Sequence, residues 1–194
     1  VDVMIVAGGD GTFSDIINAV SGDATLSYMP LGSGCALRYA LGLPPQLSRV
    51  ARRIRDGRRH ALDLILCDGT VKAFMASVGL EADIIHRRET LQADGVRGPQ
   101  AYAMATFGSL LTRLKRIDMT ITIDDRTFAF PRAVTAIVTK IAYYGYGLRM
   151  VPDAAFDDRQ LHLLAINSGR GRLVQTLATA FMDGNRLGRH EEGR

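Results

Sequence analysis

The 194-residue sequence has only two cysteines and no long apolar run, and each shortage excludes a class of protein. No stretch approaches the ~20 consecutive apolar residues of a transmembrane helix, so no membrane-spanning helix is predicted. Cys35 and Cys67 form no metal-binding spacing with each other or with the four scattered histidines. Two thiols without a disulfide framework favour a reducing compartment, and we therefore expect a cytoplasmic protein.

Negative charge is in slight deficit, since 20 acidic residues face 24 lysines and arginines, giving a formal net charge of +4. A basic balance favours anionic partners such as nucleotides, nucleic acid or the anionic face of a membrane. A solvated helix face is the simpler explanation of the densest basic cluster. That cluster consists of Arg49, Arg52, Arg53, Arg55, Arg58 and Arg59.

The first 60 residues alternate predicted strands with predicted helices. Apolar spacing and glycine or proline punctuation predict strands over 1–7 and 26–29 and helices over 13–20, 35–41 and 47–56. A strand–glycine–helix rhythm of this kind is typical of a parallel α/β domain. We expect a three-layer parallel-sheet nucleotide-binding domain over residues 1–60.

After residue 60 the pattern changes to short strands joined by tight turns. The pair Asp68-Gly69 is a strong hairpin signal. Consecutive hairpins predict a β-rich, antiparallel second domain over residues 61–194. Its predicted strands cover 61–66, 70–77, 119–123, 127–130, 133–140 and 161–166, its helices cover 100–114 and 171–182, and a polar tail covers 184–194.

The strongest local motif is a glycine loop between the first predicted strand and the first helix. Glycines let the backbone approach a phosphate closely, and the N-terminus of the following helix attracts anions. An aspartate among these peptide N–H groups is explained if Mg²⁺ or its water shell bridges it to the phosphates. The alternative is a tight turn with Asp10 as the helix N-cap. The loop consists of Gly8, Gly9, Asp10, Gly11 and Thr12.

A second glycine loop, Pro30-Leu31-Gly32-Ser33-Gly34, also follows a predicted strand and precedes a helix. In a parallel sheet both loops lie at the carboxyl edge, where ligands bind. The first loop lacks the Lys-Ser/Thr of a Walker motif and the G-x-G-x-x-G spacing of a dinucleotide fold. The pair therefore indicates a phosphate-binding edge of another type.

These residues resemble the diacylglycerol kinase, sphingosine kinase and bacterial lipid kinase family. Four blocks match in order: the first loop with Asn18 behind it, residues 30–44, residues 76–82 and residues 143–154 followed by Asp157-Asp158. The first block is shared with NAD kinases, and the fourth separates lipid kinases from them. The resemblance extends over most of the chain.

The resemblance implies transfer of the γ-phosphoryl group of ATP to the hydroxyl of a diacylglycerol- or sphingosine-like lipid, with Mg²⁺ as cofactor. It also implies a peripheral contact with the membrane and no nucleic acid partner. A homodimer is possible. Asp10 would be the catalytic residue that organises Mg²⁺ through water. The implied nucleotide contacts are Gly8, Gly9, Asp10, Gly11, Thr12, Gly32, Ser33 and Gly34. The implied ligands of a structural divalent ion are Asp153, Asp157 and Asp158.

Several departures from the family pattern keep two alternatives open. Cys35 and Ala36 stand where the family commonly has Asn and Asp, and Arg159 follows the aspartate pair in place of Gly. We also expect that elements before Val1, and a strand carrying Asp-Gly-Glu after Arg194, belong to the complete family domain. A non-catalytic nucleotide- or lipid-binding remnant is therefore the second hypothesis, and an NAD kinase the third.

Overall fold

The computed structural model describes residues 3–96, 98–111, 115–169, 171 and 175. The chain forms two compact units, and it leaves the first after Ala76 and returns to it at Thr139. The described part of the first unit is 3–76 and 139–162, and that of the second lies within 77–138 and 163–175. The sequence instead predicts two continuous domains with a boundary near residue 60.

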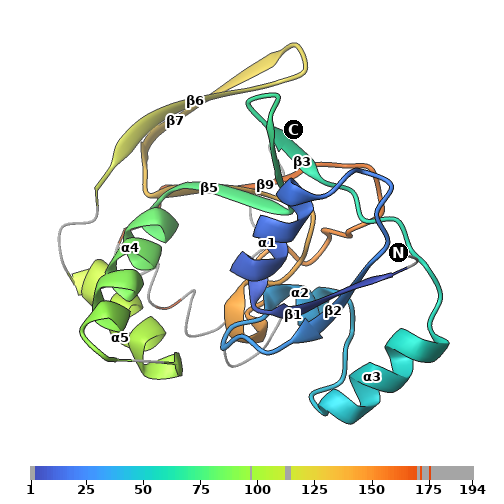
Figure 1. Ribbon diagram of the computed structural model, residues 1–194. Coiled ribbons are helices and arrows are strands. Elements are labelled where there is room, and N and C mark those ends of the chain that lie inside the picture. Colours follow the sequence, from blue (N-terminus) through green and yellow to red (C-terminus); the bar gives the residue numbers. More distant parts are fainter. Residues whose placement is uncertain (1–2, 97, 112–114, 170, 172–174, 176–194) are drawn as a thin grey trace. The chain divides into compact units, whose positions relative to one another are not determined.

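The first unit begins with two parallel strands and the helix that connects them (Figure 1). Strand β1 (Met4–Gly8) pairs with β2 (Leu26–Pro30), in a register that runs from Met4 opposite Leu26 to Gly8 opposite Pro30. Helix α1 (Asp10–Ala19) starts directly after β1 and three residues before its predicted position. The predicted parallel strand–helix–strand arrangement is confirmed.

Aromatic packing fixes α1 against the two strands. Phe13 and Ile17, one turn apart on the helix, are buried with Val6 of β1 and Tyr28 of β2. The Phe13 and Tyr28 rings meet edge to face with centroids 5.4 Å apart. Burying one such side chain stabilises the fold by about 1.5–3 kcal/mol. This core holds the N-terminus of α1 at the carboxyl ends of the strands.

Two further helices follow β2 in the first unit. Helix α2 (Ala36–Ala40) is short, and α3 (Leu47–Asp56) has the predicted bounds. Only Val50 of α3 is fully buried, and the helix contacts β2. The remaining face of α3 is exposed.

The predicted hairpin after residue 60 is present but shorter. Strands β3 (Ile65–Cys67) and β4 (Val71–Ala73) pair antiparallel around Asp68 and Gly69, whose φ angles are +50° and +68°. Positive φ at both residues suits a tight turn that matches the right-handed twist of the strands, and Thr70 N closes this turn by donating to the Cys67 carbonyl at 3.1 Å. The predicted strand over 70–77 is wrong in extent, because it is interrupted at buried Phe74, which separates β4 from β5 (Met75–Gly79).

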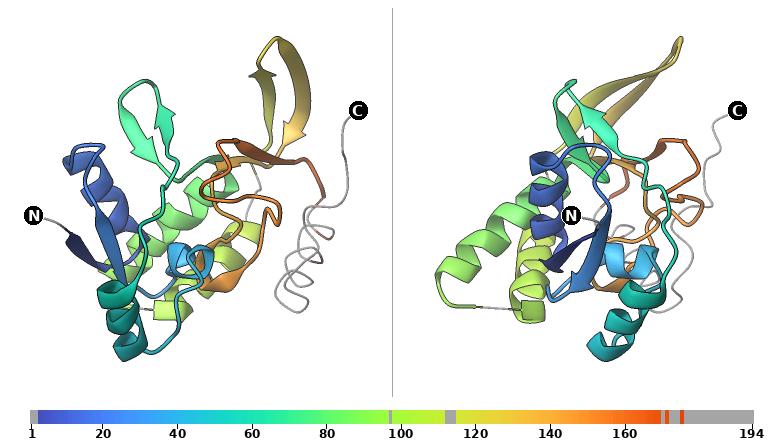
Figure 2. Two further views of the ribbon diagram at one scale, coloured as in Figure 1. Left: turned by 90° about the vertical axis from the view of Figure 1, so that its right-hand side faces the viewer. Right: turned by 45° about the vertical axis from the view of Figure 1, so that its right-hand side comes forward.

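The second unit contains a long hairpin and a helix pair. Strands β6 (Ile117–Ile123) and β7 (Arg126–Ala133) form a twisted two-stranded ribbon that turns at Asp124 and Asp125, between the strands predicted over 119–123 and 127–130 (Figure 2). Helices α4 (Leu80–Ala93) and α5 (Gly98–Leu111) lie side by side (Figure 1). The sequence analysis assigns no element to α4, whose charged and apolar residues form no regular helical stripe.

The predicted strands over 133–140 and 161–166 are confirmed as β8 (Thr135–Thr139) and β9 (His162–Ile166). They form a three-stranded sheet in the order β5-β8-β9. The predicted helix over 171–182 and the tail over 184–194 lie outside the described residues, apart from 171 and 175. Within the described ranges, no helix is both long and apolar enough to span a bilayer.

Candidate functional site

The two glycine loops meet at one edge of the β1–β2 pair, as predicted. The Gly8 carbonyl, at the end of β1, accepts hydrogen bonds from Leu31 N at 2.9 Å and Gly32 N at 3.2 Å. A side chain on Gly32 would place its Cβ 2.4 Å from the Gly9 Cα. Because no Cβ tolerates such a distance, glycine is required where the loops cross. The sequence thus encodes a contact between two backbones.

Gly11 differs from these packed glycines. A Cβ at Gly11 would meet no atom within 4 Å, although the residue lies in the first turn of α1. Alanine would favour the helix there by roughly 0.5–1 kcal/mol, and internal packing does not exclude it. The glycine therefore leaves open space at a helix N-terminus, where peptide N–H groups and the helix dipole attract an anion.

Asp10 connects the two loops through its carboxylate. Its Oδ2 accepts a hydrogen bond from Ala36 N at 2.8 Å, and its Oδ1 accepts one from Leu37 N at 3.1 Å. These donors are the first peptide groups of α2, whose own N-cap residue, Cys35, provides no side-chain cap. Asp10 thus caps α2, whereas α1, the helix that it begins, has Gly9 as N-cap. The sequence predicts Asp10 either as a Mg²⁺ residue or as the N-cap of its own helix, and it does not predict this cap on α2.

An ionised carboxylate has about four lone-pair sites, so the two hydrogen bonds that cap α2 do not by themselves exclude another role for Asp10. The predicted role of Asp10 toward Mg²⁺ and water therefore stays a prediction that the geometry permits. Thr12 lies against the loop, since a Cβ on Gly8 would come within 2.5 Å of its Oγ1. Asp10 and Thr12 thus share the first turn of α1 with Gly11.

The residues that depart from the family pattern are packed into the second loop. Cys35 adopts a left-handed conformation with φ +42° and its Sγ donates to the Gly32 carbonyl at 3.0 Å. Both Cys35 and Ala36 are buried. Burial, together with the neighbouring Cys35 thiol, raises the pKa of Tyr28 above its ordinary value, so this phenol stays neutral. Cys35 and Ala36 therefore belong to the hydrophobic core beneath the second loop.

The fourth motif block contacts the second loop. The Gly34 carbonyl accepts a hydrogen bond from Tyr146 N at 2.9 Å. Gly147, at φ +80°, allows the chain to pass Tyr39, whose Cε1 would lie 2.8 Å from a Cβ there. The rings of Tyr39 and Tyr143 lie 5.8 Å apart. Two motifs about 110 residues apart in the sequence are thus one surface, and Tyr39 is a member that the sequence analysis missed.

The predicted nucleotide contact Ser33 lies between Gly32 and Gly34 in an exposed turn. The turn is held from both sides, by the Gly8 carbonyl at Gly32 and by Tyr146 at Gly34. Backbone hydrogen bonds on both sides of Ser33 therefore fix the position of the segment that carries its hydroxyl group.

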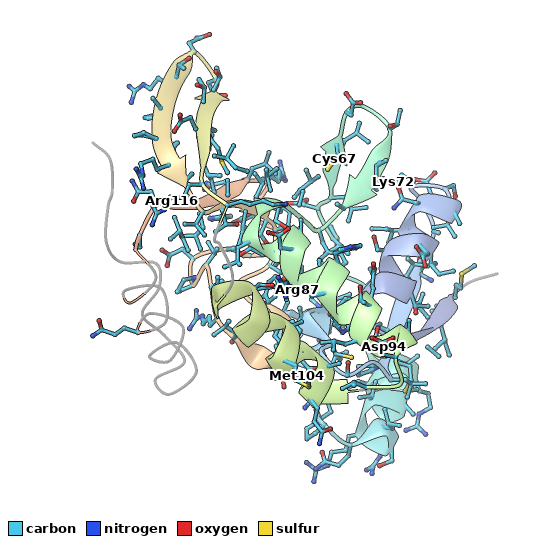
Figure 3. The ribbon with its side chains drawn as sticks, turned by 90° about the vertical axis from the view of Figure 1, so that its left-hand side faces the viewer. Cys67, Lys72, Arg87, Asp94, Met104 and Arg116 are labelled. Carbon is cyan, nitrogen blue, oxygen red and sulfur yellow. The ribbon has the colours of Figure 1, made fainter. Side chains whose placement is uncertain are left out.

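Asn18, at the far end of α1, is a structural residue. Its Oδ1 accepts from Lys72 N at 2.8 Å, and its Nδ2 donates to Lys72 O and Ser14 O, both at 2.8 Å. The Lys72 ammonium donates to the carbonyls of Ile17 and Val20 at the C-terminus of the helix. Figure 3 shows Lys72 on β4 beside α1. These bonds attach α1 to the β3–β4 hairpin and so position its other end.

The predicted metal ligands have different surroundings. Asp153 and Asp157 are exposed, whereas Asp158 forms ion pairs with Lys140 and with His162, whose Nε2 lies 2.6 Å from Oδ2. Among the described residues, no group of three or more His, Cys, Asp or Glu side chains could hold a metal ion. The sequence analysis missed Lys140, although a lysine that ends an apolar strand is itself unusual.

The Asp158 cluster is strongly ionised. Burial alone would lower the pKa of Lys140, but hydrogen bonds to Asp158 and Asp63 outweigh it and raise that pKa. The hydrogen bond from Lys140 lowers the pKa of Asp158 and that of Asp63. All three groups therefore stay charged at neutral pH.

The third motif block lies in the second unit, at the start of α4. Gly79 has φ +108°, and a Cβ there would lie 2.3 Å from the Val134 carbonyl oxygen. Glu81 is 5% exposed and hydrogen-bonds the Thr135 hydroxyl group. Burial raises the pKa of Glu81, and the hydrogen bond from Thr135 opposes that shift. Farther along the helix pair, Figure 3 shows Arg87 on α4 and Met104 on α5.

Comparison with known proteins agrees with this arrangement. Residues 1–67 match the model of the diacylglycerol kinase catalytic domain, and residues 75–191 match that of the YegS C-terminal, NAD kinase β-sandwich-like domain. The chain belongs to the diacylglycerol kinase family. Its fold is the predicted one, an N-terminal α/β domain followed by a β-rich domain, and the described part of the second unit adds the helices α4 and α5.

The family relatives are longer than this chain. A diacylglycerol kinase of Staphylococcus saprophyticus is 26% identical over 168 residues, which are 85% of this chain and 54% of that protein. A protein of Synechocystis without a described function is 31% identical over 103 residues, 53% of this chain and 24% of its own length. The chain thus spans about half the length of the diacylglycerol kinases that it matches.

Solved structures support the fold. A diacylglycerol kinase from Bacillus anthracis superimposes with a TM-score of 0.69 over 98% of this chain and 61% of that chain, at 19% sequence identity. Another structure from the same organism gives a TM-score of 0.74 over 92% of this chain and 61% of that one, at 21% identity. At these identities the likeness concerns the fold alone.

Proposed function

We propose that the protein containing this chain is an ATP-dependent lipid kinase, which transfers the γ-phosphoryl group to the hydroxyl of a diacylglycerol- or sphingosine-like lipid. The observation that carries the proposal is the crossing of two glycine loops at the carboxyl edge of β1 and β2, with Asp10 joining them. Family membership supports the same reaction.

In this proposal the peptide N–H groups of residues 8–12, at the start of α1, bind the ATP phosphates. Gly32, Ser33 and Gly34 contact the nucleotide from the second loop. Asp10 would hold Mg²⁺ through water, and the ion would supply neutralisation of the phosphate charge. Phosphoryl transfer depends mainly on alignment and on neutralisation of charge, and a rigid pair of loops provides the alignment.

The test is phosphoryl transfer from radiolabelled ATP by the complete protein. Diacylglycerol, sphingosine and related lipids are offered in mixed micelles, and NAD is offered separately. We expect a labelled lipid, and much less label with the Asp10→Ala variant. Transfer no greater than that of the Asp10→Ala variant would contradict the proposal, and labelled NAD with unlabelled lipids would instead identify an NAD kinase.

A non-catalytic binding protein is the second candidate, motivated by Cys35 and Ala36. Both are buried in the second loop, so neither provides the polar side chain that the family commonly has there. Calorimetry distinguishes the two candidates. Binding of ATP and Mg²⁺ by the complete protein, without transfer to any acceptor, would favour the binding protein.

We further propose a peripheral contact with an anionic membrane through α3 and the residues that follow it. Within the described structure, Arg53 is bound to the Gly42 carbonyl at 2.7 Å and Arg55 pairs with Asp56 at 2.7 Å. Exposed arginines that form no ion pair with any described residue remain beside Leu47, which is 44% exposed. These arginines are Arg49, Arg52, Arg58 and Arg59.

Vesicle sedimentation tests this surface. The complete protein should bind vesicles that contain phosphatidylglycerol more strongly than vesicles of phosphatidylcholine alone. Replacing Arg49 and Arg52 by Gln should weaken that binding about 10- to 30-fold, since each basic residue near the surface contributes about 1 kcal/mol. Lys115→Gln is the matched control, and equal binding to both kinds of vesicle would contradict the proposal.

A further inference from the structure

The acidic stretch that ends at Asp158 surrounds an ammonium group. Lys140, the residue that follows β8, is 1% exposed, and its charge must therefore be neutralised within the protein. Its Nζ lies 3.1 Å from Asp63 Oδ2, 2.6 Å from the Gln160 carbonyl oxygen, and in contact with Asp158 Oδ1. The lysine thus has three oxygen partners.

These three oxygens form the kind of donor set that hard divalent cations use. Ca²⁺ and Mg²⁺ bind carboxylate and backbone carbonyl oxygens, Ca²⁺ at about 2.3–2.6 Å. Two carboxylates and one carbonyl converge on a single point in this chain, and that point is the Lys140 nitrogen. The Lys140 ammonium therefore occupies the position that a divalent ion would take among these oxygens.

The carboxylates have few oxygens left for a second cation. Asp158 Oδ2 pairs with His162, and Asp158 Oδ1 also accepts from Gln160 N at 2.9 Å. Asp63 Oδ2 also accepts from Arg159 N at 2.6 Å. A divalent ion next to the ammonium would be repelled by its charge as well. The donor set in this chain is complete without metal.

We propose that the Lys140 ammonium is the resident cation of this stretch, and that it takes the place of the divalent ion that the family resemblance implies for Asp153, Asp157 and Asp158. The proposal rests on the geometry of this cluster and is independent of catalysis. It also predicts a gain of function, because removing the ammonium should leave a vacant oxygen site that binds Ca²⁺ or Mg²⁺.

Two substitutions in the complete protein separate loss of the charge from opening of the site. Lys140→Ala removes the charge and leaves room for an ion, whereas Lys140→Met removes the charge and fills the space with an apolar side chain. Thermal unfolding is followed without nucleotide, in the presence of chelator, Mg²⁺ or Ca²⁺. We expect both variants to unfold at lower temperature than the natural protein in chelator.

Metal should restore only one of the variants. At a metal concentration about ten times the dissociation constant, Lys140→Ala should gain about 3–6 °C in Tm. The natural protein and Lys140→Met should not respond. A Lys140→Ala variant that folds only with metal supports the proposal equally, and one that folds in chelator but gains nothing from either ion contradicts it.

If Lys140→Ala does not fold, a second measurement tests the proposal in proteins that retain Lys140. Mn²⁺ is titrated without nucleotide into the natural protein and into Asp158→Asn, and bound Mn²⁺ is counted by electron paramagnetic resonance. Equal numbers of bound ions support the proposal. One ion fewer in Asp158→Asn would overturn it, because Asp158 would then hold metal despite Lys140.

Discussion

Asp10 and Asp158 belong to the same compact unit, yet their carboxylates have different partners. Asp10 accepts hydrogen bonds from the peptide groups of Ala36 and Leu37, at the start of α2. Asp158 shares the Lys140 ammonium with Asp63, and its charge is neutralised. Asp158 thus has a cation beside it, whereas the two peptide groups that Asp10 caps carry no net charge. Two aspartates of one unit can therefore have different roles, one as a helix cap and the other as the counter-ion of a buried ammonium.

The largest expected effect comes from breaking the neutralised cluster. Lys140→Met leaves two carboxylates facing each other in a partly buried site, and losing one partner of a buried ion pair costs about 3–5 kcal/mol. Urea denaturation should show a fall of about 3 kcal/mol in the free energy of unfolding. A fall below about 1 kcal/mol would mean that the cluster is solvated, and the comparison with Asp10 would lose its basis.

The next effect separates the two roles of Asp10. Asp10→Ala removes the cap of α2 and should lower the free energy of unfolding by about 1–2 kcal/mol. Asp10→Asn retains one acceptor oxygen and should recover most of that stability, but it removes the charge. Calorimetry should therefore show Mg²⁺-dependent ATP affinity lost in both variants. Full affinity in Asp10→Asn would reduce Asp10 to a cap.

A third substitution tests the open space at Gly11. Gly11→Ala should stabilise the fold by about 0.5–1 kcal/mol, because alanine favours the helix and no atom obstructs its Cβ. The same methyl group would block a phosphate, so ATP affinity should fall at least about tenfold, or about 1.4 kcal/mol. Gly108→Ala, in α5, is the matched control that should leave ATP affinity unchanged. Unchanged affinity in Gly11→Ala would mean that no phosphate binds there.

The smallest effect concerns Glu81, a third carboxylate, whose side-chain partner among the described residues is the Thr135 hydroxyl group. Burial raises its folded-state pKa, so its contribution to stability is complete below the ordinary value of 4.5 and is lost as pH rises through the raised pKa. Glu81→Gln mimics the protonated acid. Its Tm should exceed that of the natural protein by up to about 3 °C at neutral pH and match it near pH 4.5. A gain that does not change with pH would contradict burial as the cause.

Much of the fold can be predicted from the sequence where one segment contains the whole signal. The parallel strands, the helix over 47–56 and both hairpin turns are examples, because apolar period, glycine position and turn residues act locally. Helix α4 could not be predicted in this way, since its stability comes from packing against α5 rather than from a regular apolar stripe. The interruption at Phe74 likewise involves a distant segment, because the Phe74 carbonyl accepts a hydrogen bond from Lys140 N, directly after β8.

The sequence by itself determined the kind of site: two glycine loops after two strands, a carboxylate among peptide N–H groups, and four motif blocks in family order. Only the tertiary structure decided which partner each carboxylate has, because hydrogen bonds and ion pairs join residues that are far apart in the chain. Asp10 meets α2, 26 residues away, and Asp158 meets Lys140 and Asp63. Spacing alone cannot distinguish an aspartate that caps a helix from one that neutralises a buried ammonium.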